Sequence, residues 1–179
     1  TTTSAAIIKM FLRLYKVNRV LFLVDRLELE TQAKKEINDI LQNDFETAIW
    51  KENKDDWRRA NIVISTVQSF TKNNKYKRIF KPNSFDLVIS DEAHRSLGQR
   101  SRNVFEYFIG FKLGLTATPR DFLKSVNEDD MSMTDPKQLE RRLMLDTYSI
   151  FGCDDGEPTY RYTLLDGVKD GFLINPTVV

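Results

Sequence analysis

The chain has 179 residues, of which 30% are charged, and a formal net charge of +1 at neutral pH. This length suits one domain with a buried core. The balanced charge excludes a bulk attraction to nucleic acid, so any such contact must come from local patches. The single cysteine, Cys153, excludes an internal disulfide framework and favours a structural thiol in a reducing compartment, the cytoplasm. The apolar runs are too short to cross a membrane.

Helical and extended patterns alternate along the first two thirds of the chain. Residues 3–15 predict a helix that is apolar on nearly every side and is therefore buried at the centre of the fold. Strands are predicted at 19–25, 45–50, 61–65, 85–91 and 111–115, and helices at 27–41, from Thr66 onward and near 102–108. This order predicts an α/β fold, a parallel sheet with helices on both faces.

Beyond Pro119 the composition changes. Residues 128–135 are acidic and favour a loop, 139–151 favour a helix, and 151–159 favour turns. Residues 162–173 predict a short helix that Gly171 ends.

Two charged segments carry no clear function. Residues 51–59 mix both signs and predict only an exposed face. A basic cluster interleaved with aromatic side chains follows; a solvated charged loop is favoured there over a nucleic-acid surface. Its members are Lys72, Lys75, Tyr76, Lys77, Arg78, Phe80 and Lys81.

The most informative segment is the apolar run over 85–89, which is followed after one residue by the tetrapeptide Asp91-Glu92-Ala93-His94. The run is typical of a buried parallel strand, and ligands in open α/β sheets bind at the carboxyl ends of strands. Two adjacent carboxylates would otherwise be costly there, although a solvated acidic turn is the structural alternative. The next strand ends in Thr116-Ala117-Thr118-Pro119. Together the two strand ends resemble motifs II and III of a superfamily 2 nucleic-acid motor.

That resemblance implies ATP chemistry, which needs Mg²⁺, an oriented water and a cradle for the phosphates. Asp91 is the expected Mg²⁺ partner through a water, and Glu92 is expected to orient and deprotonate the attacking water. His94, Thr116 and Thr118 would form a polar relay between the nucleotide and the nucleic acid, with a structural role as the alternative.

The phosphate cradle of such motors is a glycine-rich loop, and the sequence contains none. A predicted buried helix follows Thr1 at once. We therefore expect the chain to begin within a Walker A motif, with Thr1 as the Mg²⁺-ligating hydroxyl. An incidental threonine-rich start is the alternative.

As a whole, the chain resembles the first RecA-like domain of the motor (R) subunit of type I restriction enzymes. The segments that carry this resemblance are 1–15, 19–26, 64–70, 89–96, 105–108, 113–120 and 162–179. It implies a RecA-like parallel sheet sandwiched by helices, of the P-loop NTPase type but without its first strand and phosphate loop. It also implies a core domain over 1–160 and a linker over 161–179 toward a second RecA-like domain.

The resemblance further implies an ATP- and Mg²⁺-dependent translocase of duplex DNA that works with methyltransferase and specificity subunits, without a membrane. DNA contacts are expected around Asp25, Arg26, Ser65 and Thr66, since hydroxyls, helix N-termini and a guanidinium suit phosphates. The 179 residues alone should be a poor ATPase. The alternatives are another superfamily 2 motor, such as a type III restriction subunit or a DEAH-type helicase, and a catalytically silent RecA-like module that binds protein or DNA.

Overall fold

The centre of the fold is a five-stranded, all-parallel sheet with the strand order β2-β3-β1-β4-β5. The computed structural model describes residues 2–42, 44–50, 52, 55–93, 99–117, 147–153 and 157–174. The strands are β1 (Val20–Val24), β2 (Thr47–Ile49), β3 (Ile62–Thr66), β4 (Leu87–Ser90) and β5 (Phe111–Gly114). Each lies within one or two residues of its predicted position, and the predicted parallel α/β fold is confirmed.

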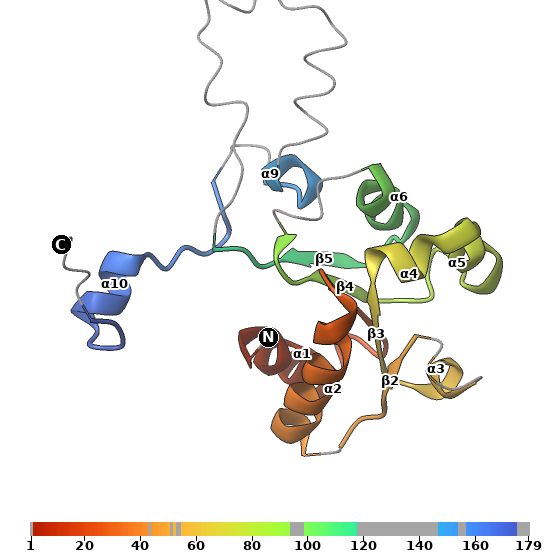
Figure 1. The fold of residues 1–179 in the computed structure, drawn as a ribbon, viewed down its shortest axis with the longest axis horizontal. Helices are drawn as coiled ribbons and strands as arrows, with labels where there is room; N and C mark the ends of the chain where they lie inside the picture. The colour runs from red at the N-terminus through yellow and green to blue at the C-terminus, as the bar shows by residue number, and fades with distance from the viewer. Residues whose placement is uncertain are drawn as a thin grey trace, which may run out of the picture.

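Helices cover both faces of the sheet (Figure 1). One face carries α1 (Thr2–Arg13) and α2 (Leu27–Leu41). The other carries α3 (Asp56–Arg59), α4 (Val67–Thr71), α5 (Lys75–Ile79) and α6 (Gln99–Tyr107), with the 3-10 turn η1 (Lys72–Asn74) between α4 and α5. The short helices α9 (Thr147–Ile150) and α10 (Leu164–Lys169) come later in the chain.

The two faces of the sheet hold separate cores. In β1 every residue is buried, and successive side chains alternate between the faces. Leu21 and Leu23 join the core under α4 and α6, whereas Phe22 packs with Ile8 of α1 and Ile37 of α2. A strand buried on both sides explains why the sequence shows a continuous apolar run instead of an alternating one.

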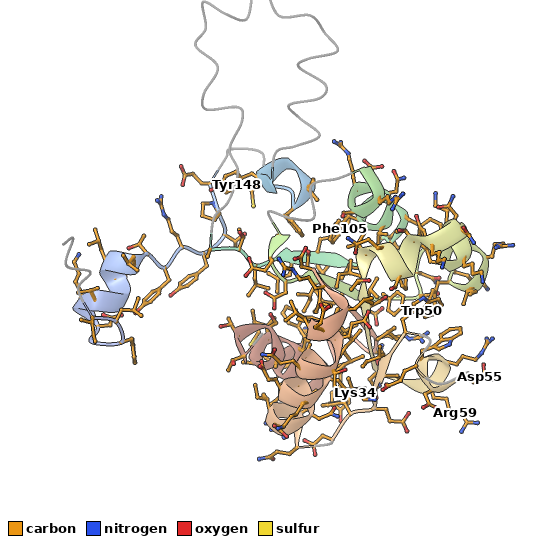
Figure 2. The ribbon with its side chains drawn as sticks, viewed as in Figure 1. Lys34, Trp50, Asp55, Arg59, Phe105 and Tyr148 are labelled. Carbon is orange, nitrogen blue, oxygen red and sulfur yellow. The ribbon has the colours of Figure 1, made fainter. Side chains whose placement is uncertain are left out.

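Aromatic rings dominate the core beneath α3, α4 and α5. Trp50 follows β2 and meets the ring of Trp57 in α3 at a centroid distance of 4.8 Å and that of Phe70 at 5.4 Å (Figure 2). The prediction that 51–59 is only an exposed face is therefore wrong, because Trp57 anchors a helical turn with 6% of its surface exposed.

The basic cluster lies on a helix as well as a turn. Tyr76 and Phe80 are buried and so cannot stack on a base, whereas the lysines and arginine around them are exposed. The charged side chains are exposed, as predicted, but the expected loop is the η1–α5 segment, and Tyr76 and Phe80 are buried in the core.

The first helix departs from its prediction. Ala5, Ile8 and Leu12 of α1 are buried, but Met10 and, just after the helix, Leu14 expose more than half of their surface. Among the described residues α1 packs on one side only, so the expectation of a helix buried all round is wrong.

In the C-terminal part, α10 starts at a capping box in which Thr163 accepts from the Asp166 N–H and Asp166 accepts from the Thr163 N–H. Gly171 follows with φ of 77°, as predicted for the residue that ends this helix. The helix predicted at 139–151 is described only over 147–150, and the loop at 128–135 lies outside the described residues. The boundary between a core at 1–160 and a linker at 161–179 stays a prediction. No helix in the described part of the chain is long and apolar enough to cross a membrane.

Candidate functional site

All five strands are parallel and therefore end at one edge of the sheet. Val24 of β1 pairs with Thr66 of β3, and Ser90 of β4 pairs with Leu23 of β1 and Gly114 of β5. The loops that leave these strands therefore begin at the same level, the carboxyl edge, where ligands bind in open α/β sheets.

This edge collects most of the residues expected to function. Asp25 and Arg26 follow β1, Asp91 and Glu92 follow β4, and Thr116 lies two residues beyond β5. Ser65 and Thr66 are the last residues of β3. Thr1, His94 and Thr118 lie outside the described residues, so their expected roles stay predictions.

A pocket of about 200 Å³ opens at this edge between β1, α2 and β4. Asp25, Asp91 and Glu92 bring three carboxylates to its wall, and Gln32 of α2 adds an amide. The sequence argument named the three acids but missed Gln32. The helical period supplies the signal, because Gln32 lies three residues after Leu29, which also lines the pocket, and so on the same face of α2.

The turn after β4 is held from both sides. The Asp91 N–H donates to the Leu23 carbonyl of β1 at 3.0 Å, and the Ala93 N–H donates to the Leu115 carbonyl after β5 at 2.8 Å. Between these two anchors Glu92 has φ of 52°, and its N–H donates to Asp91 Oδ1 at 3.2 Å. A left-handed glutamate directly after a strand is unusual, because the Cβ crowds the backbone there. Strain of this kind persists where neighbouring contacts impose it, often at functional sites.

The end of β3 is organised differently. Ser65 and Thr66 are almost completely buried. Ser65 Oγ donates to the Thr66 carbonyl at 3.0 Å, and Thr66 Oγ1 accepts from the Ser69 N–H at 3.1 Å as the N-cap of α4. Their hydroxyls shape the turn. The exposed side chain of the first α4 turn is Gln68, which the sequence argument did not single out.

After β1, the pair Asp25 and Arg26 stays closer to solvent. The Arg26 Nε donates to Asp25 Oδ2 at 3.3 Å, with 65% of the Arg26 side chain exposed. An exposed ion pair of this kind contributes little to stability. The Arg26 guanidinium can therefore leave Asp25 and turn toward an anion at a low cost in free energy. A guanidinium also matches the geometry of a phosphate well.

The acidic side chains fit a shared Mg²⁺ better than a metal cage. No group of three or more His, Cys, Asp or Glu among the described residues is arranged to hold a metal. Mg²⁺ usually keeps several waters and is bound through one or two carboxylates together with the phosphates of a substrate. Asp91 and Glu92, two hard oxygen donors at the mouth of a small pocket, suit that mode.

The fold is that of a RecA-like domain, a parallel sheet sandwiched by helices. The solved helicase domain of Hef from Pyrococcus furiosus has this fold, with a TM-score of 0.56 and 20% identity over 85% of this chain and 31% of that chain. At that identity the likeness shows the fold alone.

The chain belongs to the family described as "Type III restriction enzyme, res subunit", whose profile matches residues 1–121. It is 31% identical over 172 residues to the "Type I restriction enzyme EcoAI endonuclease subunit" of Escherichia coli, covering 90% of this chain and 17% of that protein. It is 29% identical over 200 residues to the "Type I restriction enzyme EcoKI endonuclease subunit" of Escherichia coli strain K12, covering 98% of this chain and 15% of that protein. The predicted resemblance to type I restriction subunits is confirmed, and the chain spans about one sixth of the length of these relatives.

Proposed function

We propose that this chain is an ATP-hydrolysing core of a motor that moves duplex DNA in a type I restriction complex. The observation that carries the proposal is the Asp91–Glu92 turn, which β1 and β5 hold in a strained conformation at the rim of an acidic pocket. A turn that only ended a strand would not need a left-handed glutamate.

The two carboxylates have different parts. Asp91 bonds through its own backbone to β1 and belongs to the end of a buried strand, so its carboxylate is a fixed donor for Mg²⁺. Glu92, turned by its positive φ, points its side chain in a different direction from the strand pattern and acts as the base that orients the attacking water. Bound Mg²⁺ would neutralise charge on the transferred phosphoryl group. Thr1 is proposed as a second Mg²⁺ contact.

The pocket size limits what this chain holds. A volume of about 200 Å³ is below the range of roughly 300–1,000 Å³ typical of whole small-molecule sites. It accommodates a hydrated cation and the terminal phosphate, so the base and ribose must bind elsewhere. The residual ATPase of these 179 residues should accordingly be low.

The DNA-facing role falls to the loops after β1 and β3. Arg26 is exposed and can contact a phosphate directly, whereas Ser65 and Thr66 are buried and act by shaping the turn that presents Gln68. Thr116, with His94 and Thr118, would connect this surface to the nucleotide. Methyltransferase and specificity subunits are the proposed partners of the whole motor.

Type I membership is preferred over type III for a specific reason. The family description names a type III subunit, but the type I relatives match across 90% and 98% of this chain, beyond the 121 residues of the family profile. A type III motor stays the second candidate.

The test separates binding from hydrolysis. Glu92→Gln keeps a hydrogen-bonding side chain but removes the base, so Mg-ATP binding should stay within about twofold while hydrolysis falls by on the order of 10²–10⁴-fold. Both quantities are measured in this chain and in the longest natural chain that contains it. Glu46→Gln, an exposed glutamate at the opposite edge of the sheet, is the matched control. Undiminished hydrolysis in Glu92→Gln would refute the assignment of the base.

A further inference from the structure

One buried carboxylate at the carboxyl edge has no part in the proposed chemistry. Glu30 lies in α2 and exposes only 9% of its surface, the one charged side chain among the described residues that is buried. Its Oε1 accepts a hydrogen bond from the Thr66 N–H at 2.7 Å. Hydrogen bonds to an ionised acceptor are shorter and stronger than neutral ones, and this distance is at the short end.

The hydrogen bond joins two loops. Glu30 lies about one turn inside α2, the helix that begins directly after Asp25 and Arg26. Thr66 is both the last residue of β3 and the N-cap of α4. Because Val24 and Thr66 are partners in neighbouring parallel strands, the β1–α2 loop and the β3–α4 turn leave the sheet side by side. Glu30 therefore links the β3–α4 turn to α2, the helix that follows the β1–α2 loop.

Stability does not explain a carboxylate at this position. Burial raises the pKa of Glu30 and the nearby Glu52 carboxylate raises it further, while the Thr66 hydrogen bond opposes both. Glu52 is itself paired with Lys34 Nζ at 2.9 Å, and Lys34 lies on the same helix as Glu30 (Figure 2). Burying a charge with a like charge nearby is costly, and an apolar side chain of similar volume would avoid that cost.

We propose that Glu30 is a positioning residue that fixes the β3–α4 turn relative to the β1–α2 loop and so sets the spacing of the two DNA-contacting loops. This inference rests on the proposed function. The Glu30 carboxylate accepts from the Thr66 N–H at the point where β3 ends, so it decides where the turn and the exposed Gln68 lie. Ser65 and Thr66 then act through their conformation, without touching DNA.

Charge alone and the proposed positioning role predict opposite effects on DNA binding when Glu30 is removed, so one experiment distinguishes them. Removing an acidic side chain near a DNA surface should strengthen the binding of a polyanion. Removing the acceptor for Thr66 should weaken it, by roughly tenfold if one charge-assisted hydrogen bond holds the turn. Glu30→Gln removes the charge but keeps an oxygen that can accept, whereas Glu30→Ala removes both.

The experiment titrates a duplex oligonucleotide against the full chain by fluorescence anisotropy at fixed salt, with the ¹⁵N-¹H signal of the Thr66 amide followed in parallel. Glu28→Ala is the matched control, because Glu28 is an exposed glutamate in the same first turns of α2. We expect Glu30→Ala to bind about tenfold more weakly, Glu30→Gln to bind at least as well as the unmodified chain, and Glu28→Ala to bind equally or slightly better. The Thr66 amide should lose its strongly hydrogen-bonded shift in Glu30→Ala only.

Tighter binding by Glu30→Ala, or equal losses in Glu30→Ala and Glu30→Gln, would overturn the inference. If Glu30→Ala does not fold, Glu30→Asp replaces it, because the shorter side chain keeps the charge but cannot reach the Thr66 N–H. If the unmodified chain binds no duplex, the proposed function fails while the Thr66 amide still decides whether Glu30 positions the turn. An unchanged Thr66 amide signal in Glu30→Ala would then reject the inference that Glu30 positions the turn.

Discussion

The left-handed backbone of Glu92 stores a measurable amount of free energy. For a residue with a Cβ this conformation costs about 1–2 kcal/mol, and a glycine there would avoid that cost. Glycine also gives the unfolded chain extra freedom, which lowers the free energy of unfolding by about 0.4–1 kcal/mol. Glu92→Gly should therefore leave the free energy of unfolding unchanged or raise it by up to about 1.6 kcal/mol, although it removes the proposed base and should abolish ATP hydrolysis.

A matched glycine substitution removes the unfolded-state effect. Glu46 is an exposed glutamate without a left-handed backbone, so Glu46→Gly should lower the free energy of unfolding by about 0.4–1 kcal/mol. The difference between the two variants then reports the strain at Glu92 itself, about 1–2 kcal/mol. In urea this corresponds to a separation of the unfolding midpoints by roughly 0.5–1 M. If Glu92→Gly lost as much stability as Glu46→Gly, the backbone at Glu92 would hold no strain and the argument for a functional turn would lose its support.

Two further substitutions test the packing and the buried charge. Gly110→Ala should lower the free energy of unfolding by about 1–3 kcal/mol, because its Cβ would overlap the Phe85 carbonyl oxygen and the Asp86 backbone. At Gly114 the atoms nearest to an added Cβ, from 2.6 Å, belong to the half-buried Phe151 side chain rather than to the backbone, so Gly114→Ala should cost less; equal losses in urea unfolding would contradict this. Since the pKa of Glu30 is raised on folding, the folded state binds its proton more tightly and stability falls as pH rises through that pKa. Glu30→Gln should lack this fall, so its stability relative to the unmodified chain should increase between pH 4.5, the ordinary glutamate value, and pH 7; a constant difference would show that Glu30 has an ordinary pKa.

The sheet could be predicted from the sequence because its signal is local. Each buried strand is a short apolar run, and the alternation of strands with helices leaves few topologies other than a parallel sheet. That topology also predicts that Asp25 and Asp91 meet at one edge, which the pocket between β1 and β4 confirms. The helix predicted at about 27–41 is confirmed, since its apolar positions follow the helical period.

What the sequence could not predict depends on contacts between distant segments. The backbone of Glu92 is set by the hydrogen bonds that its neighbours Asp91 and Ala93 donate to distant segments, which no local pattern encodes. The Thr66 N–H donates to Glu30, a partner 36 residues away. In α3, Trp57 is buried but its neighbours in the sequence are charged. The mixed composition of 51–59 therefore does not indicate the helical turn that the aromatic core stabilises.

The left-handed backbone of Glu92 and the buried charge of Glu30 lie at the same edge of the sheet, an observation that does not depend on any sequence motif. Within the described ranges, the other left-handed residues that carry a Cβ follow helix ends or are asparagines in a turn, where such a backbone is common. Glu92 instead follows a strand, and the buried Glu30 carboxylate lies at that same carboxyl edge. At the amino edge, by contrast, Asp86 accepts two backbone N–H groups from Asn18 and Arg19, an arrangement that stabilises the fold directly. Because strain and buried charge persist only where they are imposed, their occurrence at this one edge supports the proposal that it binds a nucleotide and DNA, independently of the motif.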